Sequence, residues 1–137
     1  MQEIDVTARS SASPEAIFAL LADAPSWSRW APFDEVVVEE GQGVGELRRF
    51  HRGRRTTRER VTALEPPRRF EYDLVSGIPI DDYHAQVTLT PEGDGTEIRW
   101  QSRFNAKIPG TGGVTRRALQ RFIRQTAEGL AREAEKR

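Results

Sequence analysis

The 137-residue sequence predicts an α+β fold in which a curved antiparallel sheet of about seven strands wraps around a long C-terminal helix. Three observations predict this fold. Apolar and polar side chains alternate with a period of two from about residue 34 for some seventy residues, which is typical of strands. Short turns rich in glycine and proline separate these segments, so successive strands pair antiparallel. From Val114 onwards the apolar period becomes helical, over a length sufficient to cross the sheet.

The segment before this sheet predicts a strand and two short helices. Residues 3–9 alternate, which predicts the first strand. Ser13, Pro14 and Glu15 then predict a helix start, because they supply a cap, a proline at the first helical position and an acidic first turn. Residues 26–30 predict a second short helical turn.

Six further strands are predicted at residues 35–40, 46–52, 56–64, 69–76, 83–90 and 96–104. The C-terminal helix contains Gly129, and a glycine costs about 1 kcal/mol relative to alanine inside a helix. Gly129 therefore predicts either the close approach of another segment or space left for a ligand. We expect a single domain over residues 1–137.

The composition excludes several classes of function. Twenty-one basic residues balance twenty-one acidic ones, so the overall charge does not favour a nucleic-acid partner. The arginines between residues 48 and 60 predict a solvated hairpin. The chain has no cysteine, and its two histidines lack metal-ligand spacing, so we expect no metal and no cofactor. The acidic N-terminus and the lack of a long apolar run predict a cytoplasmic protein with no membrane span, either a monomer or a homodimer.

Several short segments occur in a characteristic order: SPEAIF at 13–18, WSRW at 27–30, VGELR at 44–48, RERV at 58–61, EPPRRFEY at 65–72 and GTEI at 95–98. Together they resemble the START-like superfamily, also called the SRPBCC, polyketide cyclase/dehydrase-like or birch-pollen-allergen-like helix-grip fold. The resemblance covers the whole chain. It implies a cavity between the sheet and the C-terminal helix that holds a small hydrophobic molecule.

Strand alternation and the apolar stripe of the C-terminal helix select the residues that would line this cavity. They are Tyr72, Leu74, Tyr83, Ala85, Val87, Trp100, Ser102, Phe104, Phe122, Ile123, Thr126 and Leu130. The strand register that the family pattern favours adds Phe50. Trp30, in the second short helical turn, is expected either to guard one end of the cavity or to belong to a hydrophobic plug. The loop at residues 78–80 is apolar and predicts either a lid at the entrance or an oligomer contact.

Glu59 is the candidate for chemistry inside the cavity, because its position in the alternation turns it inward with Val61. A carboxylate that faces an apolar interior is costly unless it has a partner. Glu59 is therefore either a ligand-orienting group or general base, or the acidic half of a structural ion pair. Alternation alone leaves open whether Arg48 or Arg49 points inward. The family pattern favours Arg48, and we expect Arg48 to contact Glu59 across adjacent strands.

Three functions follow from these expectations. The first is binding of a lipid-like or polyketide-like hydrophobic molecule. The second is enzymatic: a polyketide cyclase, aromatase or dehydratase that uses Glu59 with Arg48 or a tyrosine as catalytic residues. The third is a non-catalytic interaction module similar to the co-chaperones of this fold.

Overall fold

The computed structural model describes residues 1–136 and contains an antiparallel sheet of seven strands. The strands lie in the order β1-β7-β6-β5-β4-β3-β2, so β2 to β7 form a meander and β1 joins it beside β7. The strands are β1 (Gln2–Ser10), β2 (Glu35–Glu40), β3 (Leu47–Arg52), β4 (Arg55–Glu65), β5 (Arg69–Ser76), β6 (Ile80–Glu92) and β7 (Gly95–Ala106). The helices are α1 (Pro14–Ala22), the 3-10 turn η1 (Ala24–Ser26), α2 (Trp27–Trp30) and α3 (Gly112–Ala134).

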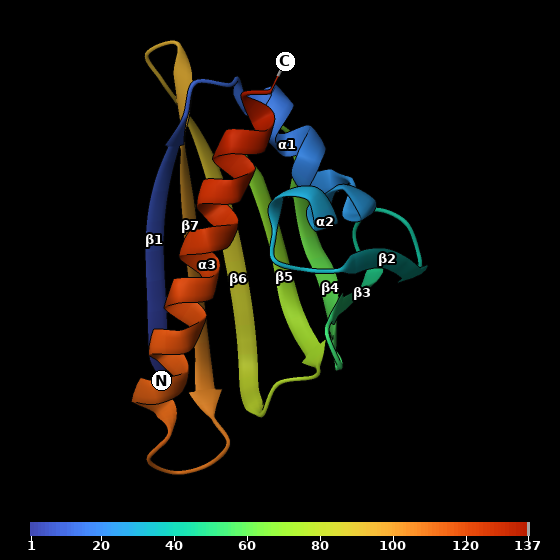
Figure 1. The fold of residues 1–137 in the computed structure, drawn as a ribbon, viewed down its shortest axis with the longest axis vertical. Helices are drawn as coiled ribbons and strands as arrows, with labels where there is room; N and C mark the ends of the chain where they lie inside the picture. The colour runs from blue at the N-terminus through green and yellow to red at the C-terminus, as the bar shows by residue number, and fades with distance from the viewer. Residues whose placement is uncertain (137) are drawn as a thin grey trace.

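The long helix α3 lies across one face of the sheet and packs mainly on β1 and β7 (Figure 1). Helices α1 and α2 contact α3, and α2 also contacts β2 at the far edge of the sheet. This arrangement confirms the predicted helix-grip fold. Because α3 lies over β1 and β7, the inner face of the middle strands has room between itself and the helix. No helix among the described residues is long and apolar enough to cross a membrane.

Local sequence signals account for the start of α1. The Ser13 side chain accepts a hydrogen bond from the Ala16 backbone nitrogen at 3.2 Å, and Pro14 occupies the first helical turn, as expected. The buried face of α1 consists of Ile17, Phe18 and Leu21. This face closes one end of the core beside the two tryptophans of α2.

The strand boundaries agree with the sequence prediction to within two residues, except at the start of β6. This strand begins at Ile80, whereas the alternation predicts a start at Tyr83. The pairing of β6 with β7 shifts between Asp81 and His84, and Asp82 has a positive φ of 53°. Such a bulge adds a residue that interrupts the alternation of side chains. The alternation therefore does not indicate the residues of β6 that precede the bulge.

Gly129 marks a close approach between two helices. A Cβ atom at this position would lie 2.0 Å from the backbone oxygen of Trp30 in α2. Of the two explanations that the sequence left open for this glycine, the structure therefore shows the close approach of another segment.

Candidate functional site: a cavity between the sheet and the long helix

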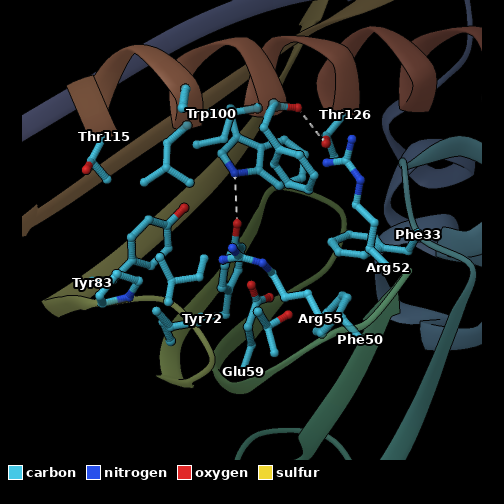
Figure 2. A pocket seen from close by; sticks show the side chains of 18 of the residues that line it. Phe33, Phe50, Arg52, Arg55, Glu59, Tyr72, Tyr83, Trp100, Thr115 and Thr126 are labelled. Carbon is cyan, nitrogen blue, oxygen red and sulfur yellow. Dashed lines mark hydrogen bonds between the residues drawn. The ribbon is translucent and has the colours of Figure 1, made fainter. Parts of the chain in front are cut away.

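A cavity of about 570 Å³ lies between α3 and the inner face of β3 to β7 (Figure 2). This volume is in the usual range for sites that hold small molecules. Its apolar and aromatic wall is formed by Trp27, Phe33, Phe50, Tyr72, Leu74, Ile78, Pro79, Tyr83, Trp100, Val114, Ala118, Leu119, Phe122 and Ile123. Its polar wall residues are Arg52, Arg55, Thr57, Glu59, Thr115 and Thr126.

The exposed part of the wall locates the mouth of the cavity. Arg52 and Arg55, at the end of the β3–β4 hairpin, are exposed, and so is Pro79 in the loop between β5 and β6. Val114, at the start of α3, is 76% exposed. The hairpin, this loop and the first turn of α3 therefore surround the mouth. The predicted loop at residues 78–80 contributes Ile78 and Pro79 to the rim, whereas Ile80 is buried.

The structure brings together eight of the residues that the sequence predicted to line the cavity, and their part in binding stays a prediction. They are Phe50, Tyr72, Leu74, Tyr83, Trp100, Phe122, Ile123 and Thr126.

Six other predicted residues are buried but lie off the cavity wall: Trp30, Ala85, Val87, Ser102, Phe104 and Leu130. Alternation identifies the face on which a side chain lies, but does not show whether the helix touches it there. Leu130 belongs to the part of α3 that packs directly into the core, and Phe104 lies on β7, against which that helix rests. Trp30 instead packs on Trp27, with ring centroids 4.5 Å apart.

Glu59 lies on the cavity wall, as its parity predicted. Figure 2 shows it on the sheet side, near Phe50 and Tyr72, with α3 along the opposite wall. The carboxyl group keeps part of its accessible surface, and this surface faces the cavity. Burial raises the pKa of Glu59 to about 8, although the positive charge of Arg48 acts in the opposite direction. The group is therefore mostly neutral at pH 7 and can donate as well as accept a hydrogen bond.

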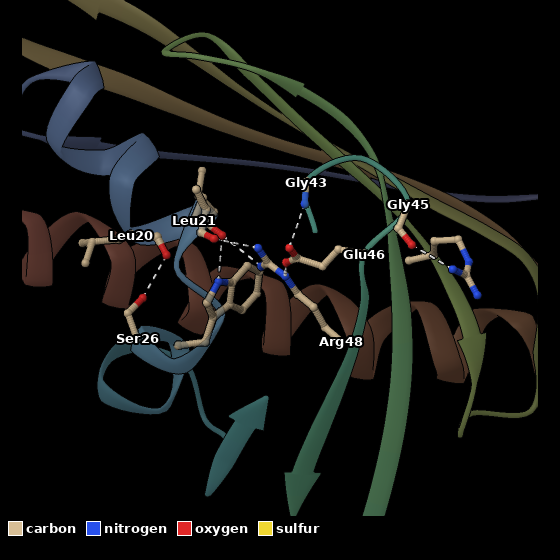
Figure 3. Close-up of polar contacts among 10 residues, drawn as sticks. Leu20, Leu21, Ser26, Gly43, Gly45, Glu46 and Arg48 are labelled. Carbon is tan, nitrogen blue, oxygen red and sulfur yellow. Dashed lines mark hydrogen bonds and ion pairs between the residues drawn. The ribbon is translucent and has the colours of Figure 1, made fainter. Parts of the chain in front are cut away.

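Arg48 and Glu59 contact each other across adjacent strands, as expected, but no hydrogen bond or ion pair joins their side chains. The two residues are direct neighbours across β3 and β4, and Arg48 does point inward with only 2% of its surface exposed. Its guanidinium, however, lies against Glu46 and the end of α1 (Figure 3), and Arg48 is not among the residues of the cavity wall. Nε donates to Glu46 at 2.6 Å, and the terminal nitrogens donate to the backbone oxygens of Leu21 at 2.9 Å and Ala22 at 3.0 Å.

This network explains why Arg48 is not available to the cavity. The C-terminal carbonyls of a helix lack intrahelical partners and carry partial negative charge, which a guanidinium satisfies. The rings of Trp27 and Phe70 cover the guanidinium carbon at 5.8 and 5.2 Å. Glu46 is fixed in turn by the Gly43 backbone nitrogen, which donates to it at 3.1 Å. Arg48 therefore joins the short helices to the sheet, and no cation among residues 1–136 forms an ion pair with Glu59.

Two tyrosine hydroxyls lie on the same wall as Glu59. The indole Nε1 of Trp100 donates to the hydroxyl of Tyr72 at 3.1 Å (Figure 2). Burial, the neighbouring Tyr83 and the charge of Glu59 all raise the pKa of Tyr72 well above its usual value. Burial and the charge of Glu59 raise the pKa of Tyr83 to about 12. Both hydroxyls therefore stay protonated and can donate a hydrogen bond to a ligand.

The sequence prediction missed Arg52 and Arg55 as wall residues. Both belong to the arginine-rich segment that was assigned to solvent. Arg52 has the same parity as Phe50 on β3, and Arg55 has the same parity as Glu59 on β4. The alternation therefore indicates both arginines as wall residues, but only when it is known which face of β3 points inward.

A sheet that grips a long helix around a largely apolar cavity defines the class of helix-grip proteins. The family model described as polyketide cyclase/dehydrase and lipid transport matches residues 1–135. The chain belongs to this family, which supports a ligand-binding or cyclase role. No curated protein matches the sequence.

Several solved structures share the fold at low sequence identity. The protein XoxI from Bacillus cereus superimposes with a TM-score of 0.85 at 15% identity, covering 99% of this chain and 97% of that one. A START superfamily protein from Mycobacterium smegmatis gives a TM-score of 0.83 at 16% identity, with 97% of each chain covered. The Zhui aromatase/cyclase from Streptomyces sp. R1128 gives 0.82 at 17% identity, covering 99% of this chain and 94% of that one. These likenesses establish the fold and leave the ligand open.

Proposed function

We propose that this protein binds a small hydrophobic molecule, lipid-like or polyketide-like, in the cavity beneath α3. The observation that carries the proposal is a cavity of about 570 Å³ whose wall is mostly aromatic and aliphatic. Apolar contact supplies most of the affinity at such a site, and a few polar groups fix the orientation of the ligand. The neutral carboxyl of Glu59 and the hydroxyls of Tyr72 and Tyr83 are the groups suited to that role.

The position of Arg48 also supports binding of a neutral group at Glu59. An arginine in contact would hold Glu59 as a carboxylate and occupy its oxygens. Because Arg48 instead bonds to Glu46, the Glu59 carboxyl remains free to contact a ligand carbonyl or hydroxyl. This open cavity favours ligand binding over the interaction-module alternative, which needs no interior space.

The test of this proposal is a substitution that fills the cavity with a larger side chain. Leu74 lies on the wall and is the cross-strand neighbour of Glu59, so Leu74→Trp places a large ring inside the site. Its neighbour Val75 is 51% exposed on the opposite face of β5, and Val75→Trp is the matched control. Binding is followed by direct excitation of the neutral fluorescent probe N-phenyl-1-naphthylamine. We expect Leu74→Trp to weaken binding at least about tenfold and Val75→Trp to leave it unchanged. Equal affinities in all three proteins would show that the probe does not occupy this cavity.

The second candidate is catalysis, and the pKa of Glu59 favours it. A carboxyl group with a pKa of about 8 accepts and returns protons near neutral pH, and it faces the same space as two tyrosine donors. On a bound poly-β-ketone, ionised Glu59 would remove a proton from a carbon between two carbonyls. That carbon would attack another ketone carbon to form a ring, and the new alkoxide would take the proton back before water is lost. The cavity would hold the chain in the folded conformer.

The variant Glu59→Gln separates the two candidates. It keeps the shape of the side chain but cannot transfer the proton. With a poly-β-ketone thioester as substrate, aromatic-ring absorbance should appear with the native protein and fall by about 100-fold or more in the variant. Binding of N-phenyl-1-naphthylamine should change much less. Ring formation at the native rate in the variant would refute the catalytic candidate.

A further inference from the structure

Two arginines at the mouth of the cavity, Arg52 and Arg55, face each other across the β3–β4 hairpin. They are directly paired in the strand register, with only Gly53 and Arg54 between them in sequence. Like charges directly opposite each other in an antiparallel pair repel and are destabilising. Both side chains line the cavity, and Figure 2 shows both extending over it from the hairpin.

A second pair of opposed arginines in the same hairpin shows how this repulsion is normally relieved. Arg49 and Arg58 are also direct neighbours across β3 and β4. Glu39 of β2 lies between them, 3.2 Å from Arg49 and 2.8 Å from Arg58. The protein therefore supplies a carboxylate to this pair.

No carboxylate of residues 1–136 forms an ion pair with Arg52 or Arg55. Asp34 lies at this hairpin, but its side chain accepts a hydrogen bond at 2.7 Å from the backbone nitrogen of Gly53. The guanidinium carbon of Arg52 lies 5.6 Å from the ring centroid of Phe122, another wall residue, which keeps its charge beside the cavity.

The remaining rim is also favourable for a negative charge. The first turn of α3 carries no acidic side chain and contributes Thr115 to the cavity wall. The unpaired backbone N–H groups of a helix N-terminus give it partial positive character. The acidic group of the wall, Glu59, lies deeper along β4, so the charged wall residues at the mouth are the two arginines.

We propose that the ligand is an amphiphile whose apolar part fills the cavity and whose anionic head, a carboxylate or phosphate, binds between Arg52 and Arg55 at the mouth. This inference rests on the proposed binding function and adds the charge and orientation of the ligand. Each guanidinium carries N–H donors whose spacing matches the oxygens of such a head. The anionic head would neutralise Arg52 and Arg55 as the Glu39 carboxylate neutralises Arg49 and Arg58.

The experiment compares ligands that differ only in the head group. Decanoate, decyl phosphate and decanol are titrated below their critical micelle concentrations, with tryptophan fluorescence as the readout because Trp27 and Trp100 line the cavity. The double variant Arg52→Gln/Arg55→Gln is compared with the native protein. Arg54 is exposed at the tip of the same hairpin and does not line the cavity. Arg54→Gln therefore removes a nearby positive charge without changing the cavity wall, and it is the matched control.

We expect the double variant to weaken binding of decanoate or decyl phosphate at least about tenfold, with decanol changed less than about twofold. The anion with the larger loss identifies the head group. Binding of the anions by the native protein should also weaken with added salt, since both arginines are exposed. Arg54→Gln should behave like the native protein.

The outcomes separate the two proposals. If decanol binds and the anions lose no more affinity than decanol in the double variant, the anionic head is refuted and the apolar site stands. An equal loss in Arg54→Gln would refute the head site as well, because it would show a general charge effect. If no ligand binds the native protein, both proposals fail. Native-like decanol affinity in the double variant also shows that it is folded.

Discussion

Replacing Glu59 by glutamine removes a carboxyl group that the fold holds in its neutral form. The pKa of this group rises from 4.5 to about 8 on folding because the cavity wall withdraws it from water. One pKa unit corresponds to about 1.36 kcal/mol, so ionised Glu59 costs the folded state roughly 5 kcal/mol at most. About 3 kcal/mol of this cost develops between pH 5 and pH 8.

The sign of the pH dependence follows from where the proton is bound. Below about pH 4.5, Glu59 is protonated in both the folded and the unfolded chain and has no differential effect. Between about pH 4.5 and 8, the unfolded chain releases the proton while the folded chain keeps it. The free energy of unfolding therefore falls as the pH rises through this window. Glutamine does not titrate, so Glu59→Gln lacks this contribution.

Urea unfolding at pH 5, 6, 7 and 8, followed by tryptophan fluorescence, measures the effect. The free energy of unfolding of Glu59→Gln minus that of the native protein should increase by about 3 kcal/mol from pH 5 to pH 8. The exposed Glu128 on α3 provides the control Glu128→Gln, whose difference should stay flat. A constant difference for Glu59→Gln would mean that the carboxyl is already ionised at neutral pH. That result would refute both the neutral anchor and the near-neutral general base.

Two further substitutions test the contacts that hold the cavity in shape. Arg48→Met should lower the free energy of unfolding, measured in urea, by about 3–5 kcal/mol, because it leaves the Glu46 carboxylate buried without its cation. A loss below about 1 kcal/mol would contradict the structural role of the Arg48–Glu46 ion pair. Gly129→Ala should lower the melting temperature by about 8 °C, for a loss of about 2 kcal/mol, since its Cβ would meet the Trp30 oxygen at 2.0 Å. A rise in melting temperature, which helix propensity alone predicts, would refute the close approach.

The alternation of side chains was sufficient to predict the sheet and the inward position of Glu59. It was sufficient because successive strand residues point to opposite faces, and β4 places Glu59 on the same face as buried Val61. It was insufficient in β3, where both Leu47 and Phe50 are apolar and buried, so parity alone gave two registers. That ambiguity concealed Arg52, whose place on the wall follows once Phe50 is known to point inward.

The size and position of the cavity could not be predicted from the sequence, for a different reason. Leu74 on β5 and Ala85 on β6 both have inward parity, yet only Leu74 reaches the cavity. The difference depends on where α3 crosses the sheet, and this is set by long-range contacts such as the approach of Gly129 to Trp30. A periodic pattern predicts the face of the sheet on which a side chain lies, but it does not predict the distance from that side chain to α3.

The environments of two arginines on β3 show how the fold separates structure from recognition. Arg48 and Arg52 lie on the same face of this strand, four residues apart. Arg48 lies beside the end of α1, where Glu46 and two backbone oxygens accept hydrogen bonds from its three guanidinium nitrogens. Arg52 lies exposed at the mouth of the cavity, where no carboxylate of the described chain forms an ion pair with it. An unsatisfied cation at a surface is tolerated because water solvates it, so its charge remains available to a ligand. In the proposed binding mode, the stability of the fold depends on Arg48 and the selection of the ligand on Arg52.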